Sequence, residues 1–263
     1  MACSLRSRES PLEHHVNCVL SIVVPVKNEA GSIPPLAREI TDAFEGAPLA
    51  WECLWIDDGS TDGTLAELRA LHASDPRHRF VSHDRNYGQS AALVTGFSHA
   101  RGSIIATLDG DLQSDPADLP RLVTLLETTG VDMVNGVRTK RADSAARVVS
   151  SKIANAFRNR LSGATATDVG CSVRVFRKKC VEGLPLFRGA HRFLPTLVAM
   201  KGWRIAESPV NHRPRRHGRT SYGVANRLWV GIADTMGVRW LVWRNVNPRI
   251  RESSPSRGEE ESP

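Results

Sequence analysis

The sequence predicts an α/β fold in which a mostly parallel β-sheet is flanked by helices. Short apolar runs of strand length alternate along the chain with segments whose apolar residues recur at helical spacing. Because several of these runs are apolar without interruption, both faces of their strands should be covered, as in a parallel sheet between helical layers. With 263 residues, 41% hydrophobic and 24% charged, the composition is globular and argues against a disordered or many-pass membrane protein.

The first elements are predicted from apolar, strand-like runs and from periodicity. Val19–Val26 and Trp51–Ile56 are runs of strand length. The segment between them, Ser32–Phe44, carries apolar residues at the spacing of one helix face. A second helix is expected over Thr64–Leu71, where Thr64 and Glu67 have the spacing of a capping box.

The later elements continue the alternation. A short strand at Phe80–Ser82 precedes a helix over Gln89–Ala100, and a buried strand at Ser103–Leu108 precedes a helix over Leu119–Glu127. A further strand is expected at Met133–Val137. In sheets of this kind ligands bind beyond the carboxyl ends of the strands, so functional residues are expected in the loops there.

Charge is distributed unevenly along the chain. Residues 138–219 hold 19 Lys and Arg but only four acids, a balance of +15, whereas the rest of the chain has a balance of −8. Such a basic segment is expected to attract phosphate-bearing partners. A basic surface that serves only solubility is the alternative.

Cysteine usage and the N-terminal residues indicate the compartment. The five cysteines are odd in number and lack C-x-x-C spacing, which favours reduced thiols in a cytosolic protein. The first 17 residues contain no apolar run of the kind that a secretory signal carries. No stretch approaches the roughly 20 uninterrupted apolar residues of a spanning helix.

Two acidic clusters follow two of the predicted buried strands. Asp57 and Asp58 follow Ile56, and Asp109 and Asp111 flank Gly110 after the strand that ends at Leu108. In an extended segment, residues two apart point the same way, so Asp109 and Asp111 are expected to act together. Two carboxylates and substrate phosphate oxygens form a typical Mg²⁺ or Mn²⁺ shell, and such hard donors argue against zinc.

The acidic clusters have other possible interpretations. Aspartate-rich loops are often only turns and helix caps. A calcium loop that starts at Asp58 is excluded, because its twelfth position is Arg69 rather than Glu. Phosphate-loop, dinucleotide-binding, nucleophile-elbow and zinc-protease motifs are absent.

Three segments together resemble glycosyltransferase family 2. They are IVVPVKNE at 22–29, DDGSTDGT at 57–64 and DGDLQ at 109–113. Within that family the chain is most similar to the polyprenyl-phosphate sugar transferases of the dolichol-phosphate mannosyltransferase type, over about residues 19–245. The resemblance implies a GT-A fold, a nucleotide-binding α/β layer, which agrees with the alternation of strands and helices.

The resemblance assigns roles by position in the motifs. Asp109 and Asp111 would bind Mg²⁺ or Mn²⁺ with Gln113 nearby. Arg138 and Arg215 would hold the donor diphosphate or the acceptor phosphate, and these two arginines with the two aspartates are the expected catalytic residues. The implied nucleotide-sugar site consists of Pro25, Lys27, Glu29, Asp57, Asp58, Asp109, Gly110 and Gln113. The implied acceptor-phosphate contacts are Arg192, Arg215, Arg216 and Arg219.

One basic loop departs from the family pattern. Residues 215–223 are similar to the family's Arg-x-x-Gly-x-Ser-Lys-Tyr-Gly loop, but Ser221 stands where Lys is usual. The missing charge is expected to come from Arg216 or Arg219.

The expected organisation has four parts. A GT-A domain at 18–225 is followed by a C-terminal amphipathic membrane-surface helix at 226–246, and disordered tails are expected at 1–17 and 247–263. Arg227 and Asp234 lie opposite an apolar stripe on this helix, and flanking arginines suit the lipid interface. A helix docked on the protein or on a partner subunit is the alternative. The stripe consists of Trp229, Ile232, Met236, Trp240 and Trp243.

The resemblance implies inverting transfer of a sugar from a GDP- or UDP-sugar to a polyprenyl phosphate. A divalent cation and arginines would stabilise the charge that develops on the leaving diphosphate. A lipid phosphate is ionised at neutral pH, so no general base is required. The enzyme is expected in the cytoplasm, peripheral on the inner face of an anionic membrane, where a membrane partner subunit could also hold it.

Three alternatives remain open at this stage. A family-2 enzyme that acts on a saccharide or another lipid would usually need a catalytic base. A nucleic-acid-binding protein fits the basic segment, but the sequence lacks basic–aromatic interleaving and any known motif, so no nucleic-acid partner is expected. An inactive scaffold would fit Ser221, but the intact Asp109 and Asp111 argue against it.

Overall fold

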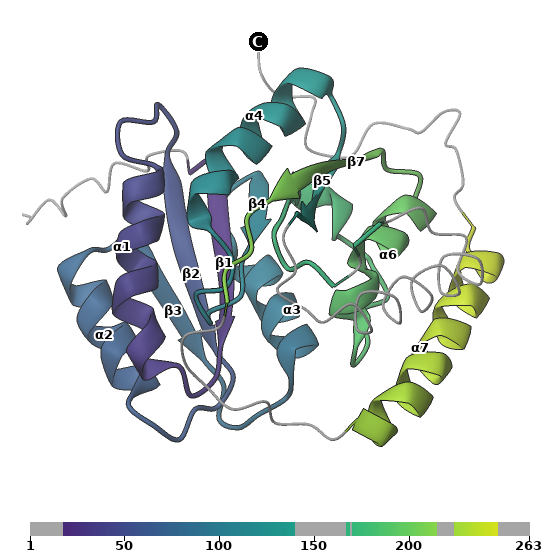
Figure 1. Ribbon diagram of the computed structural model, residues 1–263, viewed down its shortest axis with the longest axis horizontal. Helices are drawn as coiled ribbons and strands as arrows, with labels where there is room; N and C mark the ends of the chain where they lie inside the picture. Colours follow the sequence, from purple (N-terminus) through teal and green to yellow (C-terminus); the bar gives the residue numbers. More distant parts are fainter. Residues whose placement is uncertain (1–17, 140–166, 169, 215–223, 247–263) are drawn as a thin grey trace, which may run out of the picture.

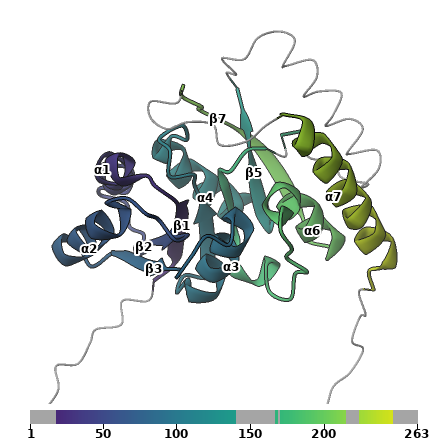
Figure 2. The same ribbon diagram turned by 90° about the horizontal axis from the view of Figure 1, so that it is seen from below.

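The computed structural model describes residues 18–139, 167, 168, 170–214 and 224–246. These residues form three layers, a central sheet between two layers of helices (Figures 1 and 2). The strands are β1 (Leu20–Val26), β2 (Trp51–Asp57), β3 (His78–Ser82), β4 (Ile104–Thr107), β5 (Met133–Arg138), β6 (Arg174–Arg177) and β7 (Ile205–Val210). The α-helices are α1 (Ile33–Ala43), α2 (Thr64–Ser74), α3 (Gln89–His99), α4 (Leu119–Thr129), α6 (Leu194–Met200) and α7 (Val224–Arg244).

The sheet is mixed but mostly parallel, as predicted. Its strand order is β3-β2-β1-β4-β6-β5-β7. β1 pairs in parallel with β2 and β4, and β5 pairs in parallel with β7. β6 is antiparallel to both β4 and β5, so those two strands run in the same direction. The carboxyl ends of β1, β2, β4 and β5 therefore lie at one edge of the sheet.

Both faces of the central strands are apolar, and helices cover both. On β2, Cys53 and Trp55 belong to the core under α1, α2 and α4, whereas Leu54 and Ile56 belong to the core under α3 and α6. Figure 2 shows these two helical layers on either side of the sheet. The mostly apolar run that predicted this strand is thus explained by burial from two sides.

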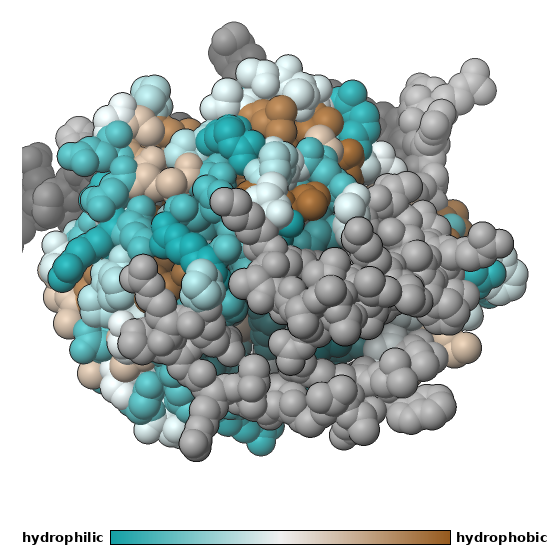
Figure 3. Space-filling view, viewed as in Figure 1, coloured by the Kyte–Doolittle hydropathy of each residue, from teal (hydrophilic) through white to brown (hydrophobic). Residues whose placement is uncertain are grey.

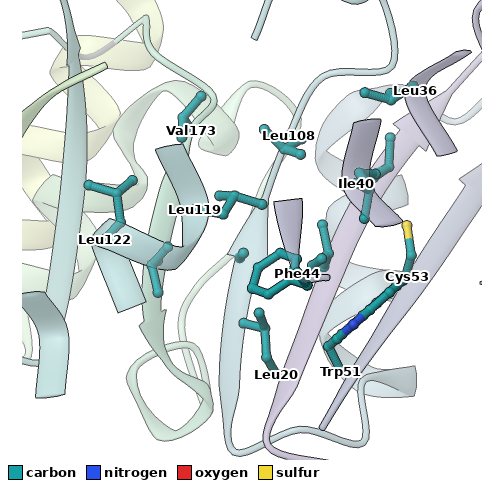
Figure 4. Close-up of a cluster of buried hydrophobic side chains, with 14 of the residues drawn as sticks. Leu20, Leu36, Ile40, Phe44, Trp51, Cys53, Leu108, Leu119, Leu122 and Val173 are labelled. Carbon is teal, nitrogen blue, oxygen red and sulfur yellow. The ribbon is translucent and has the colours of Figure 1, made fainter. Parts of the chain in front are cut away.

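The core under α1 and α4 joins the two halves of the sheet. Figure 4 shows Ile40 and Phe44 on one side and Leu119 and Leu122 on the other, with Leu20 of β1 nearby. Burying each leucine or isoleucine of such a core contributes roughly 1.5–3 kcal/mol. The strand ends that carry the acidic clusters are therefore held in place by this packed core.

The helix α7 lies against the outer side of α6 (Figures 1 and 2). Its buried Val238 packs with Phe193 and Leu197. On its outer side Met236 is 63% exposed. Two further apolar side chains on that side, Trp240 and Trp243, are 59% and 76% exposed.

The structure has a helix where the C-terminal amphipathic helix was predicted, and its contact with a membrane stays a prediction. Three residues of the predicted stripe, Met236, Trp240 and Trp243, face away from the protein, and Asp234 lies on the protein side, close to Gly189. The helix also packs on the protein through Val238, so the membrane-surface and docked interpretations are not exclusive. None of the described helices has the length and hydropathy needed to cross a bilayer.

Two strands and one helix start differ from the sequence predictions. The short β6 and the polar β7, which contains Glu207 and Pro209, were not predicted. The prediction of a capping box is wrong. Thr64 is the first residue of α2 and not the residue that precedes it, and its hydroxyl donates to Asp62 instead of capping the helix. The predicted tails lie outside the described residues.

Candidate active site

The loops after β1, β2 and β4 meet at the carboxyl edge of the sheet. The backbone N–H of Asp58 donates to the carbonyl oxygen of Val26 at 2.9 Å. The backbone N–H of Leu108 donates to the carbonyl oxygen of Val23 at 3.2 Å. The structure therefore brings the three predicted motif segments together, as the parallel topology requires.

The loop from Asp109 to Gln113 packs tightly against the end of β1. A Cβ atom on Gly110 would lie 2.6 Å from Cγ1 of Val26, so a larger residue would force a shift. The buried Leu112 has a φ of 63°, a left-handed conformation that leucine rarely adopts. Strain of this kind persists where the surroundings fix the backbone, and it is frequent at functional sites.

Asp109 and Asp111 bring two carboxylates to this edge. Asp111 is buried, and its Oδ1 accepts the Gln113 N–H at 3.2 Å. Asp109 is half-buried and accepts a hydrogen bond from Nε2 of Gln89 at 2.9 Å. Burial, and then the negative charge of Asp111, raise the pKa of Asp109. A divalent cation would relieve both effects, so this pair fits Mg²⁺ or Mn²⁺.

The protein would supply only part of the coordination shell of a cation at this pair, and a substrate would supply other ligands. Among the described residues, no group of three or more His, Cys, Asp and Glu side chains could hold a metal ion alone. Asp109 and Asp111 would therefore leave coordination positions for water, for Gln113 or for phosphate oxygens.

A cavity of about 200 Å³ opens beside Asp109. Its walls are formed by the end of β1, by α3, by the strand end that carries Asp109 and by the 3₁₀ helix η4 (Ala190–Phe193). The exposed Arg192 lines the same cavity. Its polar lining includes Gln89, Asp109, Ser172, Arg174, His191 and Arg192.

The chain enters the basic loop from beside the aspartate pair. The Arg213 N–H donates to the Gln113 carbonyl oxygen at 2.8 Å, and Nε2 of Gln113 donates to the carbonyl oxygen of Arg213 at 3.4 Å. The Arg213 guanidinium also binds Glu39 and Asp115, at 2.7 and 2.9 Å. The predicted contacts Arg215, Arg216 and Arg219 lie outside the described residues, immediately after this anchored segment.

Asp57 and Asp58 bind the protein itself. The Asp58 carboxylate accepts backbone N–H groups from Tyr87 and Gly88, at 2.9 and 2.7 Å, and lies 2.9 Å from Nδ1 of His83. Asp57 accepts from Ser60 N–H and Ser82 Oγ, at 3.0 and 2.8 Å. Both carboxylates are buried and fix the loops around the site, and contact with a nucleotide base stays a prediction.

The three residues predicted from the first motif have different surroundings. Pro25 lines the cavity, and Lys27 is exposed beyond the end of β1. Oε2 of Glu29 accepts from Ser32 Oγ at 3.0 Å, and its N–H donates to Thr64 Oγ1 at 2.9 Å. These bonds tie the start of α1 to the start of α2.

Arg138 lies at the end of β5, is half-buried and forms an ion pair with the buried Asp168. Its Nε and Nη2 donate to the two carboxylate oxygens of Asp168, at 2.7 and 2.8 Å. This hydrogen bond is the main reason why the pKa of Arg138 is raised. A Cβ atom on Gly170 would lie 2.8 Å from Nη2, so the pair supports the cavity wall. Direct binding of a diphosphate by Arg138 stays a prediction.

Two functional candidates gave no recognisable signal in the sequence. Gln89, which contacts Asp109, and Ser90, which contacts His191, begin α3 and resemble ordinary polar residues of a helix start. Gln89 and Ser90 become functional candidates only because α3 packs against the cavity in the folded structure.

The family follows from a comparison with known sequences. The model of the family described as "Glycosyl transferase family 2" matches residues 21–184, which include both acidic clusters and the cavity residues up to Arg174. The chain belongs to glycosyl transferase family 2.

Two curated family 2 relatives act on lipid phosphates, according to their names. The chain is 38% identical over 233 residues to the dodecaprenyl-phosphate galacturonate synthase of Rhizobium johnstonii, covering 87% of this chain and 69% of that protein. It is 40% identical over 205 residues to the undecaprenyl-phosphate 4-deoxy-4-formamido-L-arabinose transferase of Salmonella choleraesuis, covering 77% and 62%. The chain therefore spans about two thirds of the length of these relatives.

A solved structure has the same fold. Glucosyl-3-phosphoglycerate synthase from Mycobacterium tuberculosis, crystallised with Mn²⁺, UDP and phosphoglyceric acid, matches with a TM-score of 0.64 and 19% identity, over 88% of this chain and 80% of that one. This likeness confirms the predicted GT-A type of fold for the family 2 chain.

Proposed function

We propose that this family 2 glycosyltransferase transfers a sugar from a nucleotide sugar to a polyprenyl phosphate. The observation that carries the proposal is the aspartate pair, of which Asp109 lines one cavity together with Arg192. The names of the two curated relatives support an isoprenoid phosphate as the acceptor. The donor would be a GDP- or UDP-sugar.

The donor diphosphate would bind at the aspartate pair. Asp109 and Asp111, with Gln113 nearby, would hold Mg²⁺ or Mn²⁺, and the bound cation would neutralise the charge that develops on the leaving diphosphate. The Mn²⁺ and UDP in the solved relative support this choice of ligands. Pro25, Lys27 and Glu29 would shape the nucleotide side of the site, and Asp57 and Asp58 would hold its loops in place.

The acceptor phosphate would bind on the side of Arg192. An anionic phosphate oxygen attacks the anomeric carbon, the bond from that carbon to the diphosphate oxygen breaks, and its electron pair leaves with the nucleoside diphosphate. A single displacement inverts the configuration. Arg215, Arg216 and Arg219 would add charge from the segment that begins beside Gln113.

The make-up of the cavity favours a phosphate acceptor over a hydroxyl acceptor. A sugar or lipid hydroxyl must lose its proton, which usually requires a carboxylate or imidazole base. Among the described residues that line the cavity, Asp109 is the carboxylate, and it would be bound to the cation. His191 is the imidazole, and burial lowers its pKa to about 4, so that it is a weak base. A phosphate needs no such base.

Membrane contact would come from α7. Its exposed Met236, Trp240 and Trp243 form an apolar side next to the exposed Arg239 and Arg244, the combination that suits an anionic lipid surface. The enzyme would then work as a peripheral protein on the cytoplasmic face, alone or with a membrane subunit. This arrangement would bring a lipid acceptor to the side of the site formed by η4 and α6, on which α7 packs.

A donor panel tests the proposal. The full chain is incubated with polyprenyl phosphate in anionic vesicles, Mg²⁺ or Mn²⁺, and radiolabelled GDP- and UDP-sugars one at a time. We expect labelled lipid that organic solvent extracts, with one class of donor. Label that appears only in a saccharide acceptor, or in no lipid with any donor, would contradict the proposal.

A matched pair of variants tests the acceptor side. Arg192 and Arg188 are both exposed and lie in the same segment, but Arg192 lines the cavity and Arg188 does not. We expect Arg192→Ala to raise the KM for polyprenyl phosphate about tenfold, because a charge-assisted phosphate contact is lost. Arg188→Ala should leave this KM unchanged.

A further inference from the structure

A serine–histidine pair forms part of the cavity wall. Ser90 is the second residue of α3, and its Oγ lies 2.9 Å from Nδ1 of His191 on η4. The Ser90 side chain is nearly buried, and His191 lines the cavity. The pair therefore connects the start of α3 to the wall that also carries Arg192.

The bonds around Ser90 decide where its proton points. The backbone N–H groups of Gly189 and His191 both donate to Ser90 Oγ, at 3.1 and 3.3 Å. A hydroxyl oxygen has two lone pairs and one proton. With both lone pairs accepting, the hydroxyl proton is left to donate to Nδ1 of His191.

This arrangement fixes the form of the imidazole. A nitrogen that accepts a hydrogen bond carries no proton, so neutral His191 must carry its proton on Nε2. The doubly protonated ring would place an N–H against Ser90 Oγ, which has no lone pair left for it. Among the described residues, no hydrogen bond to Nε2 is found, and this nitrogen is left for the cavity.

The charges that shift the pKa of His191 are those of two arginines, Arg192 and Arg174. Nη1 of Arg174 on β6 donates to the His191 carbonyl oxygen at 3.1 Å, and Arg192 follows in the chain. Asp109 stands on the same cavity, and Asp234 of α7 lies beside Gly189. An N–H directed into such surroundings suits an oxygen that only accepts hydrogen bonds, such as a phosphate oxygen.

We infer that Ser90 locks His191 in its Nε2–H tautomer, and that this N–H donates to a phosphate oxygen of the substrate held in the cavity. The inference rests on the proposed function, since it names a contact of that same site. The phosphate oxygen could belong to the lipid acceptor or to the donor diphosphate. His191 is then a binding residue whose Nε2–H always acts as a hydrogen-bond donor, and it cannot serve as a general base through Nε2.

The ionisation of His191 is consistent with this assignment. Burial, followed by the charges of Arg192 and Arg174, lowers the pKa of His191 to about 4. The neutral ring is therefore the form present at physiological pH.

Two isosteric substitutions test the donor. In His191→Gln the side-chain amide N–H can occupy the place of Nε2–H, whereas in His191→Asn the amide reaches only the place of Nδ1. We expect His191→Asn to raise one substrate KM about tenfold or more, and His191→Gln to stay within about threefold of the native enzyme. A rise in the lipid-phosphate KM identifies the acceptor, and a rise in the nucleotide-sugar KM identifies the donor. Folded variants that both retain native KM values for both substrates would overturn the inference.

The lock itself is tested without any turnover. Nitrogen-15 spectra of the imidazole ring in the full chain distinguish the two neutral tautomers. We expect pure Nε2–H for His191 in the native protein and a mixture of tautomers in Ser90→Ala. Native Nδ1–H, or a folded Ser90→Ala protein that keeps pure Nε2–H, would overturn the lock. Because this readout needs no sugar transfer, failure of the proposed function and failure of the lock are distinguishable.

Discussion

At the scale of single residues, Asp109 and Asp111 set the electrostatic character of the site. Two carboxylates at the end of a buried strand repel each other, which is one reason why the pKa of Asp109 is raised. The pair is therefore more stable with a cation between its charges and those of a diphosphate. Removing either charge should weaken binding of the cation far more than it affects the fold.

The first prediction concerns this pair. Asp109→Asn and Asp111→Asn should each lower turnover at least about 10³-fold, because a cation that contributes several kcal/mol to the transition state is lost. Calorimetric titration of Mn²⁺ in the presence of UDP should show the loss of binding directly. The control Asp84→Asn, at an exposed position after β3, should keep both properties. Native Mn²⁺ affinity in both site variants would remove the metal assignment.

The second prediction concerns Gly110. A Cβ atom there would lie 2.6 Å from Val26, so Gly110→Ala should displace the loop and destabilise the protein by about 1–3 kcal/mol. A displacement of about 1 Å at the reacting groups should also lower turnover about 100-fold. Urea unfolding and activity assays measure the two effects. Gly31→Ala, where nothing lies within 4 Å, is the matched control and should change neither.

Residue roles were predictable from the sequence only where chain neighbours carry the signal. The spacing of Asp109, Gly110 and Asp111 after an apolar run predicted their place at the strand edge, and the structure confirms that place. Asp58 finds its hydrogen-bond partners in residues 83–88, and Arg138 finds its partner in Asp168. Partners so far apart in the sequence produce no periodic pattern from which the contact could be predicted. Long-range hydrogen bonds of this kind arise from the tertiary structure.

At the scale of elements, α7 is the helix whose exposed side has no apolar partner among the described residues. Val238 packs inward, whereas Met236, Trp240 and Trp243 are mostly exposed on the other side. An isolated exposed hydrophobic residue is normal on a protein surface, but three on one helix side indicate a binding surface.

The third prediction tests this surface. The double variant Trp240→Ser/Trp243→Ser should bind anionic vesicles at least about tenfold more weakly than the native chain, because two interfacial aromatic side chains are lost. Co-sedimentation with phosphatidylglycerol vesicles measures the binding. The control Tyr87→Ser/Val94→Ser removes two exposed apolar side chains elsewhere and should bind normally. Equal sedimentation of all three proteins would reject the lipid surface.

Elements were predictable where burial on both faces or one periodic stripe dominates the sequence. β1, β2 and β4 are mostly apolar runs, and their predicted positions are confirmed within a residue or two. β6 has four residues with arginine at both ends, and β7 has only two buried residues, so neither carries a recognisable run. Their place in the sheet is set by pairing with β5, which is far away in the chain.

At the scale of the whole molecule, the proposed function assigns donor and acceptor to different halves of the sheet. β1, β2 and β3 with their helices form the side that would hold the nucleotide, and β6, η4, α6 and α7 form the side that would hold the acceptor. Figure 3 shows that hydrophilic side chains predominate over the described surface near α1. The basic residues of the segment 138–219 lie in the second half of the chain, as an anionic lipid acceptor would require.

Stability of the whole molecule should depend on pH through a buried histidine that joins three elements. His78 of β3 is 2% exposed, accepts a hydrogen bond from Nε1 of Trp55 on β2 at Nδ1, and lies 3.3 Å from Thr41 Oγ1 on α1. Burial is the main reason why the pKa of His78 is lowered to about 4. Protonation would put a proton on the nitrogen that accepts from Trp55, so the folded state strongly favours the neutral ring.

The fourth prediction follows from the sign of this shift. In the unfolded chain His78 should protonate near its ordinary pKa of about 6.5, so its contribution is fully present above that pH and is lost progressively toward pH 4. Between pH 7.5 and 4.5 this one group should lower the free energy of unfolding by about 2 to 3 kcal/mol. Urea unfolding of the native protein and of His78→Gln at both pH values isolates the contribution of His78 to the free energy of unfolding, because the carboxylates contribute equally in the two proteins. The His78→Gln variant should be less stable than the native protein at pH 7.5, but its free energy of unfolding should fall by about 2 to 3 kcal/mol less on acidification. The control His99→Gln, at an exposed position, should show the same pH dependence of stability as the native protein. If His78→Gln lost as much stability as the native protein, the acid sensitivity would have to come from other groups than this buried ring.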